Sequence, residues 1–205
     1  MALTTDSLEY DILFDAVLSV KDLDPTALSC EIGLREGGGS KYMLDAMVSS
    51  GSYRTHLTLD PYGNIDYETS EGRIMHHDYT NEMRNQCMVD LYNYVKNELS
   101  NKINVLFFNL EDTEFFERFG DGVPIYAANK TMATKYAVIH YDGPHARKPL
   151  DVELAFFTPR MVKGGVAVFD DIANYDHTAF ENESLFPAGY KLIKKGYRKA
   201  SYRLD

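Results

Sequence analysis

Five short apolar segments alternate with segments of helical periodicity, and this alternation constrains the fold more than any other feature of the sequence. The apolar segments span residues 28–34, 55–59, 104–108, 136–141 and 166–169. Mostly apolar runs of this length are typical of buried strands. Strands that alternate with helices pair in parallel through crossover connections. The sequence therefore predicts an α/β fold with a doubly wound, mostly parallel sheet.

The intervals between these strands are filled by segments with apolar residues at helical spacing. They span residues 8–20, 40–50, 81–99, 113–119 and 149–157. Residues 61–79 are polar and loop-like, and the glycines of 163–165 predict a turn. Two more strand-like segments, 190–193 and 197–204, are separated by too few residues for a parallel crossover, so they must be antiparallel. We expect about seven strands, ending in an antiparallel hairpin.

No internal repeat or linker-like tract divides the chain. We therefore expect one domain over residues 1–205, with an N-terminal helical segment at 1–27 and an α/β core at 28–205. The formal net charge of −10 disfavours nucleic acid as a partner. No signal peptide or apolar stretch of transmembrane length is evident, and Cys30 and Cys87 are typical of buried thiols. We expect a cytoplasmic protein with no membrane partner, which could form a homo-oligomer.

Basic residues nevertheless concentrate near the C-terminus. They are Lys191, Lys194, Lys195, Arg198, Lys199 and Arg203. We interpret them as the solvated faces of the terminal strands, although such a cluster could also meet an anionic partner.

Acidic residues follow four of the five predicted parallel strands. They occur in Glu31-Ile32-Gly33, at Asp60, in Asp142-Gly143 and in Asp170-Asp171. Because ligands bind outside the carboxyl ends of the strands in an open α/β sheet, these acids should lie at a binding site.

The segment EIGLREGGGS at 31–40 joins the first strand to a helix. Its glycines allow close approach of a ligand, and free N–H groups at a helix start suit an anion. Arg35 stands where a dinucleotide-binding motif has its second glycine. Asp60 follows the second strand and could accept the hydroxyls of a ribose. The glycine loop could instead serve only packing, and Asp60 could form a turn with Pro61.

Four motifs together resemble the class I S-adenosylmethionine-dependent methyltransferases, and more narrowly the group of macrocin O-methyltransferase-type and catechol O-methyltransferase-type enzymes. The motifs are EIGLREGGGS, TLDPYG, YAVIHYDGPH and GGVAVFDDI, at 31–40, 58–63, 136–145 and 164–172. The resemblance covers about residues 28–205, and the last two motifs are its most specific part. It implies a Rossmann-like sheet closed by an antiparallel hairpin, as the terminal strands suggest.

The resemblance also implies roles for individual residues. Those expected to hold the methionine part of the cofactor are Glu31, Gly33, Gly37, Gly38, Gly39 and Ser40. Asp60 would hold the ribose, Asp112 would lie near the adenine, and Asp142 would also face the cofactor. The metal-binding acids would be Asp142, Asp170 and Asp171, although catechol-type enzymes usually have Asn in the last place. His145, beside Asp142, lies where catechol-type enzymes carry a basic lysine, so both are candidate catalytic residues.

Chemistry also favours a metal at the three acids. Converging carboxylates repel one another without a cation, and an oxygen-rich set suits a hard ion such as Mg²⁺. The ion would favour the ionised form of a substrate hydroxyl. Asp170 or Asp171 could instead cap a helix, and His145 could be a structural hydrogen-bond donor. Lys148 is a weaker base candidate, and His76-His77-Asp78 a weaker metal site.

The leading functional hypothesis is an O-methyltransferase that uses S-adenosylmethionine and Mg²⁺ on a small hydroxylated molecule, such as a sugar or a phenol. One alternative is a nicotinamide-dependent oxidoreductase, because Asp60 would serve that cofactor too. Another is a non-catalytic protein that binds an adenosyl ligand or assembles with partners on the same fold. The short N-terminal segment predicts that residues 61–79 or a partner subunit enclose the substrate.

Overall fold

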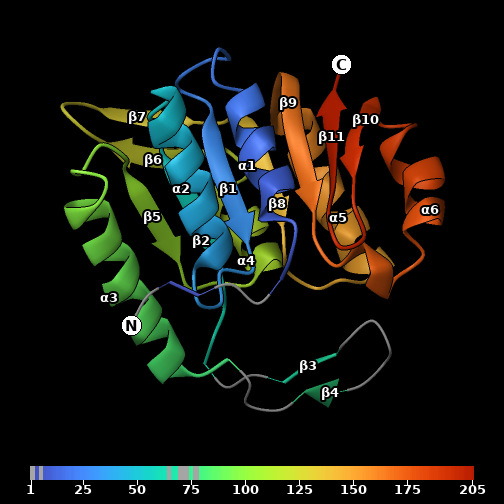
Figure 1. Ribbon diagram of the computed structural model, residues 1–205, viewed down its shortest axis with the longest axis horizontal. Helices are drawn as coiled ribbons and strands as arrows, with labels where there is room; N and C mark the ends of the chain where they lie inside the picture. The colour runs from blue at the N-terminus through green and yellow to red at the C-terminus, as the bar shows by residue number, and fades with distance from the viewer. Residues whose placement is uncertain (1–2, 5–6, 64–65, 69–73, 76–78) are drawn as a thin grey trace.

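The computed structural model describes residues 3–4, 7–63, 66–68, 74–75 and 79–205. Its centre is a seven-stranded sheet with the strand order β10-β11-β9-β8-β1-β2-β5 (Figure 1). The strands are β1 (Leu28–Ile32), β2 (His56–Leu59), β5 (Val105–Phe108), β8 (Tyr136–Tyr141), β9 (Met161–Phe169), β10 (Tyr190–Lys195) and β11 (Ala200–Leu204). The neighbouring strands β9, β8, β1, β2 and β5 pair in parallel, and β11 pairs antiparallel with both of its neighbours, β9 and β10. The predicted fold class, including the terminal hairpin, is confirmed.

Helices cover both faces of this sheet (Figure 1). One face packs against α1 (Tyr10–Ser19), α2 (Gly38–Ser50) and α3 (Asn81–Asn97). The other packs against α4 (Asp112–Phe119), α5 (Arg147–Phe157) and α6 (His177–Phe180). Short helical turns also occur at η1 (Thr158–Arg160), η2 (Ile172–Asn174) and η3 (Glu181–Leu185).

The central strands are apolar on both sides because both faces are covered. Along β9, Val166 and Val168 belong to the core under α1 and α2, whereas Ala167 and Phe169 belong to the core under α4 and α5. This alternation follows from the two-residue period of a strand. The strand ends are thereby fixed from both sides, which positions the residues that follow them.

The turn predicted at 163–165 is wrong, because β9 runs through it without interruption. The pairing of β8 with β9 shifts register between Tyr136 and Val138, and Gly164 has a φ of +80°. The glycines therefore accommodate an irregularity inside one strand. Cys30 and Cys87 are buried free thiols, as expected.

Two small hairpins were not predicted. β6 (Val123–Tyr126) pairs with β7 (Lys130–Ala133), and most of their residues are exposed or half-buried. β3 (Tyr67–Glu68) pairs with β4 (Ile74–Met75) within the segment expected to be a loop, beyond the carboxyl edge of the sheet (Figure 1). Across the part of the chain that the structure describes, no helix is long and apolar enough to cross a membrane.

Candidate active site

A cavity of about 750 Å³ opens at the carboxyl ends of the parallel strands. Its wall comes from the loops after β1, β2, β5, β8 and β9, and from residues just before α1. This edge is where ligands bind in an open α/β sheet. The sequence-predicted site residues that line the cavity are Gly33, Gly38, Gly39, Asp60, Asp112, Asp142, His145, Asp170 and Asp171.

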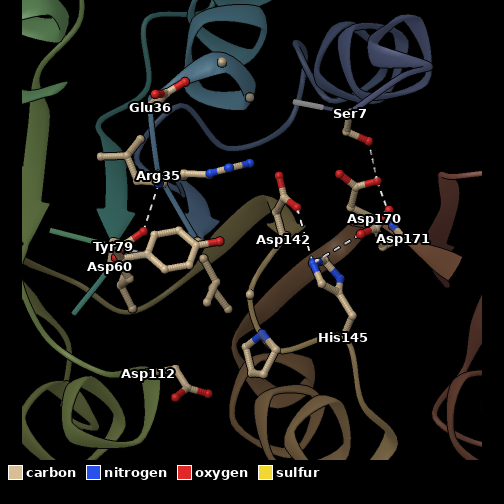
Figure 2. Close-up of a pocket in the computed structure, with 18 of the residues that line it drawn as sticks. Ser7, Arg35, Glu36, Asp60, Tyr79, Asp112, Asp142, His145, Asp170 and Asp171 are labelled. Atoms are coloured by element: carbon tan, nitrogen blue, oxygen red, sulfur yellow. Dashed lines mark hydrogen bonds and ion pairs between the residues drawn. The ribbon is translucent and has the colours of Figure 1, made fainter. Parts of the chain in front are cut away.

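The predicted residues gather at two ends of the cavity (Figure 2). The β2 end contains Gly33 and Asp60, which follow β1 and β2. The β9 end contains Asp142 and His145, which follow β8, and Asp170 and Asp171, which follow β9. Asp112, at the start of α4, lies apart from both groups (Figure 2). Residues far apart in the sequence therefore share one cavity because their strands are neighbours in the sheet.

Gly33 brings the loops after β1 and β8 into close contact. Its φ is +83°, and a Cβ at this position would overlap the backbone oxygen of Asp142. The Asp142 N–H donates to the Ile32 carbonyl at 2.9 Å, and the Gly33 N–H donates to the Leu59 carbonyl at 2.9 Å. Only glycine fits this conformation and this spacing without strain. Gly33 therefore allows the loop after β1 to pack directly against the loop that carries Asp142.

Asp60 is held by backbone donors at the β2 end. Its carboxylate accepts the Arg35 N–H at 2.8 Å and the Tyr62 N–H at 3.1 Å. Burial raises the pKa of Asp60 to about 6, against the lowering effect of these two hydrogen bonds. A carboxylate held by two backbone N–H groups still has free lone pairs, which can accept hydrogen bonds from hydroxyl groups of a ligand.

The β9 end brings an imidazole between two carboxylates. His145 Nε2 lies 3.8 Å from Asp142 Oδ1 and 3.8 Å from Asp171 Oδ2. Burial lowers the pKa of His145, although the neighbouring Asp171 and Asp170 favour its charged form. Burial and the neighbouring Asp170 raise the pKa of Asp142 well above its usual range. A neutral imidazole that faces carboxylates can accept a proton and be stabilised once charged.

Two basic side chains that were not predicted for this site complete the β9 end. Lys199 is fully buried and forms an ion pair with Asp170. Arg198 Nη1 lies 2.8 Å from Asp171 Oδ1. Burial alone would raise the pKa of Asp170, but the Lys199 ammonium lowers it to about 2. The interpretation of the C-terminal basic residues as solvated faces is therefore wrong for Lys199.

Glu31 and Ser40 belong to a buried row of hydrogen-bonded side chains that does not line the cavity. Ser40 Oγ donates to Glu31 Oε2, and Glu31 Oε1 lies 2.9 Å from His140 Nδ1. On the other side, Ser40 Oγ lies 2.8 Å from His56 Nε2. Gly39 packs so closely against these side chains that a Cβ at position 39 would overlap Glu31 Oε1. His56 and His140 were not singled out from the sequence, although polar residues inside apolar strands were the available signal.

The family of the chain follows from a comparison with protein-family models. The model described as a methyltransferase domain matches residues 30–172, which include the sequence-predicted residues at both ends of the cavity. The chain belongs to the methyltransferase domain family. This confirms the resemblance on which the sequence prediction was based. A search of curated proteins found no match.

Solved structures share the fold of this methyltransferase-family chain at low sequence identity. A Staphylococcus aureus protein assigned as a caffeoyl-CoA O-methyltransferase has a TM-score of 0.59 and 14% identity, covering 98% of this chain and 85% of its own. A Bacillus cereus O-methyltransferase in complex with SAH has a TM-score of 0.56 and 12% identity, and the match covers 99% of this chain and 84% of that one. A third structure is that of the O-methyltransferase TomG from Streptomyces achromogenes, involved in tomaymycin synthesis, in complex with SAM. It has a TM-score of 0.55 and 10% identity, and the match covers 99% of this chain and 82% of that one.

The three acids expected to bind a metal meet at the β9 end, but the oxygens of two of them, Asp170 and Asp171, already have donors. Both oxygens of Asp170 and both of Asp171 accept hydrogen bonds or ion pairs within the chain. Another group, Glu31, His140 and Asp142, offers ligand atoms within 4.8 Å of one another. Its imidazole and its bonded Glu31 differ from the all-oxygen set that Mg²⁺ prefers. The residues of this methyltransferase-family site therefore do not fit Mg²⁺ as predicted.

Three remaining sequence predictions have different outcomes. Gly37 and Lys148 are not among the lining residues, and Lys148 is exposed. Asp171 precedes η2 without a side-chain capping bond to it, so the helix-cap alternative finds no support there. His76, His77 and Asp78 lie outside the residues that the structure describes.

Proposed function

We propose that this chain is an S-adenosylmethionine-dependent methyltransferase that methylates an oxygen of a small hydroxylated molecule, such as a sugar or a phenol. One observation carries the proposal. A single cavity has a backbone-held carboxylate, Asp60, at one end and a carboxylate-flanked imidazole, His145, at the other. The first suits the ribose of an adenosyl group, and the second suits removal of a proton from a hydroxyl.

The β2 end would hold the cofactor. Asp60 would accept the ribose hydroxyls, and the glycine backbone at Gly33, Gly38 and Gly39 would allow the methionine part to approach closely. Asp112 lines the cavity where it could meet the adenine. When bound, the cofactor supplies a methyl group attached to a positively charged sulfur.

The β9 end would prepare the acceptor. His145 would take the hydroxyl proton on its neutral ring, and Asp142 and Asp171 would stabilise the charged ring that results. The Mg²⁺ assistance expected from the sequence is not part of this proposal, because the residues at the β9 end do not fit that ion. Assembly into a homo-oligomer stays a prediction from the sequence, and no step of this mechanism depends on it.

A transfer assay tests the proposal. The protein is incubated with methyl-labelled S-adenosylmethionine and a panel of phenols, catechols and sugars. We expect a labelled methyl ether from at least one acceptor, and a rate about 100-fold lower for His145→Gln, since general bases contribute about that much. Lys148→Gln, which alters an exposed basic residue nearby, should keep the wild-type rate.

Three outcomes would contradict the proposal or part of it. S-adenosylhomocysteine binding without transfer to any acceptor would favour a non-catalytic binding protein. Binding of NAD(H) in place of the adenosyl ligands would favour the oxidoreductase. Equal loss of rate in Lys148→Gln and His145→Gln would refute the assignment of the base.

A further inference from the structure

Two of the three acids at the β9 end, Asp170 and Asp171, are paired with basic side chains of the same protein. Asp170 and Lys199, 2% and 0% exposed, form a buried ion pair. Arg198 pairs with Asp171 at 2.8 Å and also lines the cavity. Together the two basic side chains carry two positive charges, which is the charge of one divalent ion.

These pairs also occupy the oxygens that a metal would need. Asp170 Oδ1 accepts Ser7 Oγ at 3.0 Å and the Asp171 N–H at 2.7 Å, while its Oδ2 faces Lys199. Asp171 Oδ2 accepts Asn174 Nδ2 at 3.0 Å. Mg²⁺ demands near-ideal octahedral geometry, so it would have to displace these donors and lie beside an ammonium group. Such an arrangement is electrostatically unfavourable.

The positions of Lys199 and Arg198 are fixed by the N-terminal part of the chain. The Glu9 carboxylate accepts the backbone N–H groups of Tyr197, Arg198 and Lys199 at 2.8, 2.8 and 3.0 Å. Lys199 Nζ also lies 4.4 Å from the centroid of the Tyr10 ring. Charge-assisted hydrogen bonds to three consecutive amides hold the turn between β10 and β11 in one conformation. The two cations are therefore built into the site.

We propose that Lys199 and Arg198 take the place of a divalent metal, so that this protein transfers methyl groups without one. The inference rests on the proposed function and concerns the same site. Arg198, which lines the cavity, stabilises negative charge on the acceptor oxygen. Lys199 is a positioning residue, because it does not reach the cavity and acts by holding the Asp170 carboxylate.

Titration with Mn²⁺, followed by electron paramagnetic resonance, tests the inference on four proteins. They are wild type, Lys199→Met, Lys199→Arg and Lys199→Met/Asp170→Asn. We expect wild type and Lys199→Arg to bind no Mn²⁺ at submillimolar concentration. Lys199→Met frees the Asp170 carboxylate and should bind one ion, whereas the double variant should bind none. S-Adenosylhomocysteine affinity and the transfer rate of wild type should be the same in EDTA and in Mg²⁺.

Stoichiometric binding of Mn²⁺ to the wild type, or a transfer rate that EDTA abolishes and Mg²⁺ restores, would overturn the inference. The wild-type measurements decide this even if Lys199→Met does not fold. A wild type that binds neither S-adenosylhomocysteine nor S-adenosylmethionine would instead overturn the proposed function. The Mn²⁺ titration would then still decide whether the two cations exclude a metal.

Discussion

Asp60 at the β2 end and Asp170 at the β9 end are the same residue type, at the same edge of one sheet, 4% and 2% exposed. Asp60 is held by backbone N–H groups, and burial raises its pKa to about 6. Asp170 is also subject to burial, but the Lys199 ammonium brings its pKa down to about 2. The partner therefore decides what each carboxylate can do. One keeps acceptor capacity for a ligand, and the other is an internal counterion.

The largest effect should come from removing that counterion's partner. Lys199→Met leaves Asp170 buried without a cation, so the free energy of unfolding should fall by about 3–5 kcal/mol. Urea denaturation at neutral pH measures it, with Lys199→Met/Asp170→Asn as the matched control that should recover most of the loss. Unchanged stability in Lys199→Met would show that the two residues are not paired in solution.

The next effect concerns ligand binding at the β2 end. Asp60→Asn replaces a carboxylate that could accept two ribose hydroxyls, so affinity for S-adenosylhomocysteine should fall by about 100-fold, or about 3 kcal/mol. Asp112→Asn should lower this affinity less, because Asp112 is expected to make only one contact, with the adenine. Calorimetric titration compares the two variants, and equal losses would remove the special role of Asp60.

The raised pKa of Asp60 also predicts that the stability of the protein depends on pH. The folded-state pKa of Asp60 lies above its ordinary value of 3.8, so the folded chain binds more protons between pH 3.8 and about 6. Asp60 therefore favours folding at the acid end of this window, and its contribution is lost as pH rises. The stability of wild type relative to Asp60→Asn should fall by about 3 kcal/mol across it. A flat difference between the two denaturation series would contradict the raised pKa.

The smallest stability effect belongs to Arg198, whose side chain is 37% exposed. Arg198→Gln breaks a partly solvated ion pair, so the free energy of unfolding should change by less than about 1 kcal/mol. Its transfer rate should nevertheless fall, since the side chain lines the cavity. Denaturation and steady-state kinetics on one preparation separate the two effects, and a parallel loss of both would assign Arg198 a purely structural role.

The sequence predicts what depends on local pattern and topology. Apolar runs identify the five parallel strands, and the rule for strand ends brings Asp60, Asp142 and Asp170 to one cavity. The β6–β7 hairpin was missed because Pro124 interrupts the short apolar run of β6, and β7 is mostly exposed with mixed polar and apolar residues. The Lys199–Asp170 pair was missed because it depends on a turn that Glu9 fixes from the other end of the chain.

Calorimetric titration of the wild-type protein with S-adenosylhomocysteine, in EDTA, tests the central claim most directly. The account predicts binding of one molecule per chain at micromolar concentration, the same affinity after addition of Mg²⁺, and no binding of NAD(H). Absence of heat with S-adenosylhomocysteine under both conditions would contradict the account, because the cavity would then not be an adenosyl-cofactor site.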